Sequence, residues 1–168
     1  MKKKLVSILF IGLMLISSVN LAACSKEPNW SFSKEEKVFS GETSKIQLQK
    51  GEKIPLSGGG FAIRVYYKVT NLSSESENAY ALLLKEIVGL YQNDKELEST
   101  TIVFADVPNI ESAINVEMKP DETVDVYVDY EISDYESDVE IKFTEDSGED
   151  TRATLTLKMN DLVEATEN

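Results

Sequence analysis

Residues 61–69 carry the clearest structural pattern in this chain. Apolar and polar positions alternate there, with one set formed by Phe61, Ile63, Val65, Tyr67 and Val69 and the other by Ala62, Arg64, Tyr66 and Lys68. Because successive side chains of a β-strand point to opposite faces, the first set predicts a buried face and the second a face in water. We therefore expect a strand that covers a core on one side only.

Similar short segments recur after residue 44. The alternating apolar positions are Ile46, Leu48, Ile54 and Leu56, then Ile114, Val116 and Met118, then Val124, Val126, Val128 and Tyr130, then Val139, Ile141 and Phe143, and last Ala153, Leu155, Leu157 and Met159. Turns are expected at Lys50-Gly51-Glu52, Gly58-Gly59-Gly60, Lys119-Pro120-Asp121-Glu122 and residues 145–150. Several short alternating strands with frequent turns predict an all-β fold, an antiparallel β-sandwich.

Residues 80–92 fit two structures. Tyr80, Leu84, Ile87 and Tyr91 have the spacing of a helical stripe. However, residues 82–84 are three consecutive leucines, and residues 92–95 resemble a hairpin turn. The period of a short apolar run does not separate the two structures. We expect a strand over residues 82–92, with a helix as the alternative.

The N-terminus combines three features of an export signal. Lys2, Lys3 and Lys4 precede an apolar stretch over residues 5–19, and small residues precede Cys24. This order is typical of a secretory signal peptide, and the stretch is shorter than the roughly 20 residues of a membrane-spanning helix. Leu21-Ala22-Ala23-Cys24 resembles a bacterial lipobox. The resemblance implies cleavage between Ala23 and Cys24 and attachment of diacylglycerol to the Cys24 sulfur, which would anchor the protein to the outer face of the cell membrane.

Cys24 is the only cysteine in the chain. If its sulfur carries lipid, the exported domain has no internal disulfide, although its compartment would permit one. The domain must then be held together by packing. A chain of this size is large enough for one core.

The charge balance is strongly acidic. The chain has 17 Lys and Arg against 30 Asp and Glu, and loss of Lys2, Lys3 and Lys4 would leave 14 against 30, a net charge of −16. Nucleic-acid binding is not expected, since phosphate contacts need a basic surface. An anionic membrane surface would also repel the domain.

We expect four segments along the chain. Residues 1–23 are the signal peptide, residues 24–44 a lipid-anchored tether, residues 45–160 the β-sandwich domain and residues 161–168 a polar tail. Within the tether, Trp30, Phe32, Val38 and Phe39 are apolar exceptions. We expect the last part of this segment to pack as a first strand or onto the edge of the domain, with a free aromatic docking site as the alternative.

Three motifs together resemble a known family. They are the strand ending Tyr66-Tyr67-Lys68-Val69-Thr70-Asn71, the hairpin Tyr91-Gln92-Asn93-Asp94-Lys95-Glu96-Leu97, and the turn Lys119-Pro120-Asp121-Glu122-Thr123 before a strand ending at Tyr130. In this order they resemble the domain of unknown function 5067, found in secreted lipoproteins of Gram-positive bacteria. The resemblance implies an Ig-like β-sandwich and no catalytic residue.

The residue content limits enzymatic and metal chemistry. The chain has no histidine and no cysteine besides Cys24, which excludes histidine-dependent triads and histidine or cysteine metal sites. Carboxylate pairs of the kind that wall hydrolases use remain open. Calcium binding is a further alternative, with Asp146, Glu149 and Asp150 as weak candidates in an acidic loop. We expect no cofactor and no catalytic residue.

The remaining class is a binding module. Arg64, Tyr66 and Tyr127 are predicted to be exposed, and arginine and tyrosine are enriched at the energetic centres of interfaces. We therefore expect a non-catalytic, lipid-anchored envelope protein that binds another protein or a cell-wall component, with these three residues as the candidate binding surface.

Overall fold

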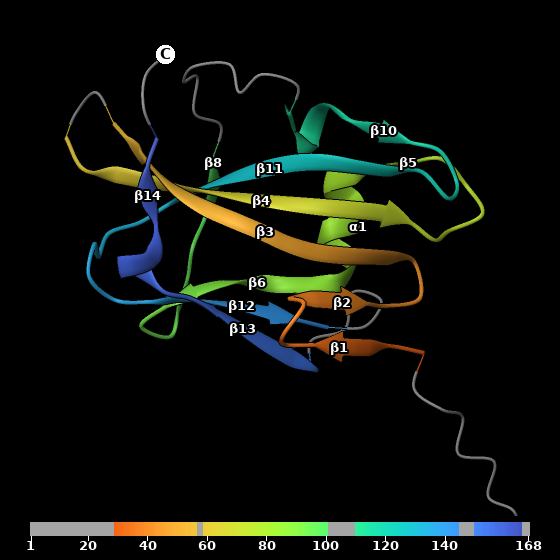
Figure 1. Cartoon of the computed structure of the whole chain (residues 1–168), viewed down its shortest axis with the longest axis horizontal. Coiled ribbons are helices and arrows are strands. Elements are labelled where there is room, and N and C mark those ends of the chain that lie inside the picture. Colours follow the sequence, from red (N-terminus) through yellow and green to blue (C-terminus); the bar gives the residue numbers. More distant parts are fainter. Residues whose placement is uncertain (1–28, 57–58, 101–109, 145–149, 166–168) are drawn as a thin grey trace, which may run out of the picture.

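Two β-sheets pack face to face in the computed structural model, which describes residues 29–56, 59–100, 110–144 and 150–165 (Figure 1). The elements in chain order are β1 (Ser31–Ser33), β2 (Val38–Ser40), β3 (Ser44–Pro55), β4 (Phe61–Asn71), β5 (Glu77–Asn78), α1 (Ala79–Glu86), β6 (Ile87–Gln92), β7 (Lys95–Glu96), β8 (Ser99–Thr100), β9 (Glu111–Ser112), η1 (Ala113–Asn115), β10 (Glu117–Met118), β11 (Thr123–Glu131), β12 (Val139–Phe143), β13 (Ala153–Leu157), η2 (Met159–Asp161) and β14 (Val163–Glu164).

The sheet order confirms the predicted all-β antiparallel sandwich. Within the described residues, the larger sheet has eight strands in the order β1-β2-β3-β4-β11-β8, with β14 beside β3 and β9 beside β11. The smaller sheet runs β13-β12-β6-β7, and β5 pairs separately with β10. Only β9 and β14 are parallel to their described partners. The core between the sheets is formed by residues that include Ile46, Val65, Tyr67, Val126, Leu90, Ile141, Phe143 and Leu155.

Strand β4 is buried on both faces over most of its length. Its inner face matches the prediction, because Ile63, Val65, Tyr67 and Val69 are fully buried. Its outer face does not, because Ala62, Arg64 and Tyr66 are buried as well and only Lys68 is exposed. Alternation showed that the two faces differ, but the apolar or polar character of a side chain did not decide its exposure.

The turn predicted at Lys50-Gly51-Glu52 is absent from the described structure. Strand β3 instead pairs with β4 from Ser44 to Pro55, with a register shift between Leu48 and Lys50. Gly51 faces the core, where an added Cβ would lie 2.8 Å from the Leu162 side chain. The glycine is therefore explained by close packing and not by a turn.

Strands of the larger sheet already occur before the predicted boundary at residue 45. Strands β1 and β2 form a hairpin that pairs with β3, and this confirms the expected first strand within the predicted tether. The ring of Phe39 stacks on Trp30 at 5.9 Å and on Phe143 at 5.0 Å between ring centroids. These contacts tie the hairpin to β12 of the smaller sheet. The predicted tail also begins later than residue 161, because Leu162 packs on the core and β14 pairs with β3.

Residues 80–92 contain both structures that the sequence allowed. Helix α1 occupies residues 79–86 and β6 follows, so the predicted strand is wrong over residues 82–86 and confirmed over residues 87–92. Asn78 begins the helix, since its side-chain oxygen accepts hydrogen bonds from the backbone N–H groups of Tyr80 and Ala81. Leu82 and Leu83 are buried while Leu84 is 55% exposed. In a helix, three consecutive leucines cannot all point to the buried face, so the third is left exposed.

The predicted turns of the other hairpins are mostly confirmed. Asn93 and Asp94 have φ angles of 51° and 61° between β6 and β7, the left-handed region used by tight hairpin turns. The N–H of Glu122 donates to the carbonyl of Lys119 across 3.1 Å. Gly59 and Gly60 have φ near +89° between β3 and β4. The turn at residues 145–150 falls almost wholly outside the described residues.

The strand predicted through Ile114, Val116 and Met118 is wrong in its first half. Ile114 lies in η1 and is 47% exposed, whereas Met118 lies in β10 and is fully buried. By contrast, β11, β12 and β13 coincide with the predicted strands. Met159 is buried but belongs to η2.

We predict that Phe39→Ala lowers the free energy of unfolding by about 3–5 kcal/mol, because it removes a fully buried ring that joins the two sheets. Urea denaturation followed by circular dichroism measures the change. Leu72→Ala is the control, since Leu72 is 42% exposed and an exposed substitution costs about 0.5 kcal/mol or less. A loss for Phe39→Ala no larger than that of the control would show that the β1–β2 hairpin is not part of the domain.

Candidate functional site

Two rows of polar and aromatic side chains cross the outer face of the larger sheet. Strand register aligns Lys50 with Tyr66 and Tyr127 in one row and Glu52 with Arg64 and Asp129 in the next. We call these six residues the outer ladder. The three predicted binding residues, Arg64, Tyr66 and Tyr127, all belong to it.

A two-pronged ion pair lies at the centre of the outer ladder. Arg64 Nε donates to Asp129 Oδ1 at 2.7 Å, and Arg64 Nη2 donates to Asp129 Oδ2 at 2.9 Å. Both side chains are only 2% exposed. The Arg64 guanidinium carbon also lies 3.9 Å from the centre of the Tyr127 ring. Burial works to lower the pKa of Arg64, but the hydrogen bonds and charge of Asp129 outweigh this effect and raise the pKa overall.

Glu52 connects the two rows of the outer ladder. The Tyr66 hydroxyl donates to Glu52 Oε2 at 2.7 Å, and Lys50 forms an ion pair with the same carboxylate. Burial works to raise the pKa of Glu52, but the hydrogen bonds from Lys50 and Tyr66 and the charges of Lys50 and Arg64 lower it overall. Burial and the Glu52 carboxylate raise the pKa of Tyr66. The phenol therefore stays protonated and bound.

The outer ladder does not match the predicted exposed binding surface. Arg64 and Tyr66 are 2% and 3% exposed, and only Tyr127 is partly open. Their donors and charges are matched inside the sheet, so the ladder acts as a structural unit. The three predicted residues lie together, and the prediction of exposure was wrong for Arg64 and Tyr66.

A groove opens elsewhere, at the edge of the smaller sheet. It encloses about 510 Å³ between α1, β6 and the segment that crosses from β7 to β8. Its apolar wall is formed by Leu83, Leu84, Ile87, Leu90 and Leu97. The Tyr80 hydroxyl lies 2.8 Å from the Ser99 hydroxyl and ties α1 to β8 across the groove. We call this feature the β6 groove.

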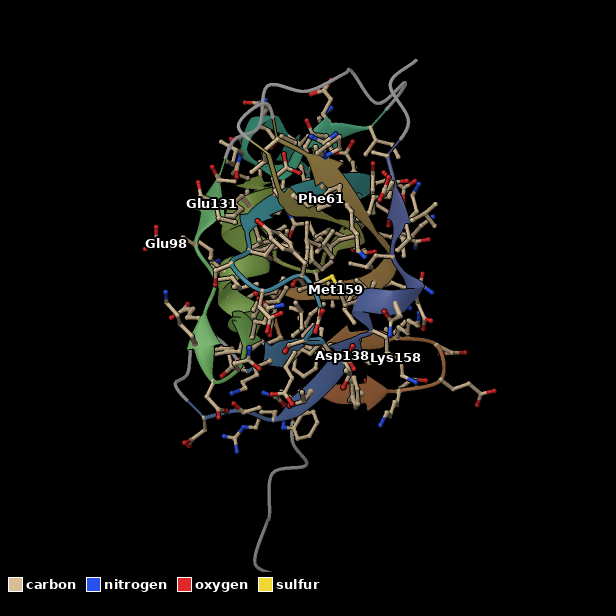
Figure 2. The ribbon with its side chains drawn as sticks, turned by 90° about the vertical axis from the view of Figure 1, so that its left-hand side faces the viewer. Phe61, Glu98, Glu131, Asp138, Lys158 and Met159 are labelled. Carbon is tan, nitrogen blue, oxygen red and sulfur yellow. The ribbon has the colours of Figure 1, made fainter. Side chains whose placement is uncertain are left out.

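Carboxylates line the open side of the β6 groove. Glu96 and Glu98 belong to it and are exposed, and both also line a neighbouring hollow of about 400 Å³ together with Glu131. Figure 2 shows Glu98 and Glu131 on the same side of the molecule, and the N–H of Glu131 donates to the carbonyl of Glu98 at 3.0 Å. Within the described ranges, none of these three carboxylates forms an ion pair.

Little in the sequence predicts the β6 groove. Its walls come from a helix, a strand and a crossover, and their side chains meet only after the chain folds. The one local signal is Leu84, because a third consecutive leucine on a short helix cannot share the buried face of Leu82 and Leu83. Glu96-Leu97-Glu98 looks like an ordinary hairpin arm in the sequence.

Glu86 is another buried group that the sequence did not reveal. It ends α1 with an exposed fraction of 0%, and its Oε1 accepts hydrogen bonds from Thr43 N and Thr43 Oγ1 at 3.3 and 3.0 Å. A Cβ at Gly41 would overlap the same carboxylate. Glu86 therefore fastens the end of the helix to the loop before β3.

The predicted calcium and lipidation residues lie mainly outside the described residues. Asp146 and Glu149 are not described, while Asp150 is described and exposed. Within the described ranges, no three acidic side chains come close enough together to hold a metal ion. Ala23 and Cys24 also lie outside the described residues.

We predict that Arg64→Met lowers the free energy of unfolding by about 3–5 kcal/mol, because it leaves the Asp129 carboxylate buried without its partner. The double variant Arg64→Met with Asp129→Leu should recover much of that loss. Urea denaturation provides the measurement for both.

Asp125→Asn is the matched control for this pair. Asp125 lies in register with Lys68 on the same two strands, and their ion pair of 3.6 Å is 45% and 50% exposed. An exposed pair contributes about 1 kcal/mol or less. If Arg64→Met cost no more than Asp125→Asn, the buried pair would not be the centre of the sheet.

We also predict a Glu52-dependent loss of stability in acid. Because the folded pKa of Glu52 is lowered, its contribution is complete above the ordinary pKa of 4.5 and is lost as the pH falls through the folded value. The unfolding free energy of Glu52→Gln should therefore fall less steeply than that of the wild type below pH 4.5. NMR titration should show that Tyr66→Phe raises the pKa of Glu52. An unfolding free energy that falls equally steeply with decreasing pH in Glu52→Gln and in the wild type would contradict this account.

Comparisons with known proteins agree with the fold. The model of the domain of unknown function DUF5067 matches residues 19–145. A candidate lipoprotein of Staphylococcus aureus subsp. aureus NCTC 8325 has a TM-score of 0.68 at 13% identity, over 81% of this chain and 97% of that one. A candidate lipoprotein of Bacillus subtilis subsp. subtilis str. 168 has a TM-score of 0.53 at 16% identity, over 75% of this chain and 39% of that one.

These comparisons establish family and fold. No curated protein matches the chain. None of the helices in the described ranges has the length and apolar character that crossing a bilayer requires. Because the family model matches more than half of its length, the chain belongs to the DUF5067 family of domains of unknown function.

Proposed function

We propose that this chain is a lipid-anchored extracytoplasmic lipoprotein whose β-sandwich binds another protein or a component of the cell envelope, without catalysis. The anchoring part is supported by Leu21-Ala22-Ala23-Cys24 after a short apolar stretch, and by two structural neighbours that are themselves candidate lipoproteins. Two acyl chains on Cys24 would hold the protein stably, whereas one chain binds reversibly.

The distance between the anchor and the domain is short. Six residues lead from Cys24 to Trp30, which packs against the core, so the link spans at most about 21 Å at roughly 3.5 Å per residue. A free tether through residue 44 would reach farther. The sandwich is therefore expected to work close to the membrane, at the level where envelope proteins and the inner wall are accessible.

The β6 groove is the single observation that carries the binding part. It combines an apolar wall with exposed carboxylates that have no ion-pair partner within the described ranges. Concave apolar surfaces with a few convergent polar groups are the usual form of a binding site. The absence of histidine from the whole chain supports a non-catalytic role.

We predict that Cys24→Ser releases the protein from the membrane fraction, because serine cannot form the thioether to diacylglycerol. Cell fractionation and immunoblotting measure the distribution. Ser25→Ala is the control and should stay in the membrane fraction. A Cys24→Ser protein that stays as firmly bound as the control would refute lipid anchoring.

We predict that crosslinking of intact cells, followed by purification of the protein, recovers a defined additional component. The Cys24→Ser variant, which lacks the anchor, should recover less of it because the protein is no longer concentrated at the membrane. Recovery of the protein alone at every crosslinker concentration would contradict a binding role.

A further inference from the structure

We infer that the β6 groove accepts an extended segment of a partner protein, which adds to the free edge of β6 as a further strand and alternates apolar with basic residues. This inference rests on the proposed function and specifies the partner class for it. The argument has three parts: an open strand edge, an apolar wall beside it, and the sign of the charge around it.

The open edge results from the shortness of β7. On one side β6 pairs with β12, from Ile87 to Tyr91. On the other side β7 pairs only with Tyr91 and Gln92, and the N–H of Leu97 then donates to the carbonyl of Leu90 at 2.8 Å. Among the described strands, none pairs with residues 87–89 on that side. The N–H of Ile87 donates to the carbonyl of Leu83 in α1, so the edge available to a partner begins after Ile87. Unpaired N–H and C=O groups of a strand edge are a template for another strand.

The chain itself leaves this edge because it changes sheets. After Leu97 it crosses to β8, which pairs with Asp129 and Tyr130 of the larger sheet. The crossover and α1 thus form two walls with the edge of β6 between them. The open stretch after Ile87 is about 7 Å long at roughly 3.3 Å per residue, enough for two or three residues of a partner.

The two sides of this edge offer different surroundings. Toward the core, Leu84, Ile87 and Leu97 line the groove and would take apolar side chains. Toward the outside, Gly89 has no side chain, and a Cβ there would lie 2.8 Å from Glu96 Oε1. Because side chains of an added strand alternate between these two sides, the bound segment should alternate as well.

The charge determines which residues alternate with the apolar ones. Glu96 and Glu98 face the groove, and Glu131 lies in the adjoining hollow. A lysine or arginine on the outer side of the added strand would meet Glu96. A second copy of this chain would instead bring the same carboxylates and a net charge of −13 or below against each other. The charge thus favours a basic partner over self-pairing.

Synthetic peptides test strand addition directly with the full-length protein purified in detergent. The probe is an eight-residue peptide of alternating valine and lysine, and the control is the same peptide with alternate backbone nitrogens methylated. Methylation removes the N–H donors but keeps the charge. We expect it to weaken binding about tenfold or more, and we expect the unmethylated probe to slow amide hydrogen exchange at residues 88–90. Equal binding of the two peptides, or protection only elsewhere, would overturn the inference.

Variants assign the contacts within the groove. Glu96→Gln should weaken binding about two- to fivefold and reduce its salt dependence. Leu84→Ala should weaken binding about fivefold. Leu84 is 55% exposed, so this variant should fold, and Leu72→Ala, at a position 42% exposed, is its matched control. Loss of binding in the control as well, or no loss in either groove variant, would show that the peptide does not occupy the groove.

A photoreactive amino acid in intact cells separates this inference from the proposed function. Placed at position 84, it should crosslink a partner, whereas at position 72 it should not. Crosslinks only at position 72 would overturn strand addition at β6 but preserve a binding role. No crosslink at either position, together with no component recovered by general crosslinking, would overturn both. Crosslinking of the protein to itself at position 84 would overturn the basic partner in favour of a second copy.

Discussion

Burial of β4 on both faces is the constraint on which the rest of the structure depends. Its inner face supplies Val65 and Tyr67 to the core between the sheets, and its outer face supplies Arg64 to the ion pair with Asp129. Neither charge of that pair could be buried alone, because an uncompensated charge away from water is strongly destabilising. The strand is therefore stable only with β3 and β11 in their observed register. The same register aligns Glu52 and Lys50 with Tyr66.

Aromatic packing takes the place that a disulfide has in many exported sandwiches. Cys24 is the only cysteine in the chain, so no internal disulfide can join the two sheets and side-chain contacts hold them together. Phe39 stacks on Phe143 across the sheets, and Trp30 stacks on Phe39 in turn. This arrangement draws the β1–β2 hairpin into the domain. If Cys24 carries lipid, as we propose, the packing of Trp30 also keeps the domain close to the membrane.

The outer ladder and the β6 groove differ in whether their polar groups already have interaction partners within the protein. On the outer ladder, each charge and hydroxyl described above has a counterpart within the sheet. At the β6 groove, carboxylates are exposed beside apolar side chains and a strand edge. A surface whose interactions are already satisfied gains little by binding, whereas one with unused hydrogen-bonding groups and apolar area gains from both. This difference is why the groove, and not the predicted tyrosine and arginine surface, is the better candidate for recognition.

The prediction from sequence succeeded where the signal was local. Alternation in residues 61–69 and 124–130 located β4 and β11, and the turns at residues 92–95 and 119–122 were correct because turn chemistry depends on adjacent residues. The prediction failed at residues 82–86, where the local pattern fits both a helix and a strand. It also failed at Gly51, where the glycine allows close packing and does not form a turn. Capping by Asn78 decided the first case, and the Leu162 side chain decided the second.

By itself, then, the sequence determined an all-β sandwich, an acidic domain that cannot rely on an internal disulfide if Cys24 is lipidated, and the strand that carries Arg64 and Tyr66. Only the tertiary structure decided that these side chains are buried, that the hairpin before residue 45 completes the core, and that α1, β6 and the β7–β8 crossover enclose a groove. The reason is physical. Periodicity records which face of an element a side chain occupies, whereas exposure depends on what other parts of the chain are brought against that face.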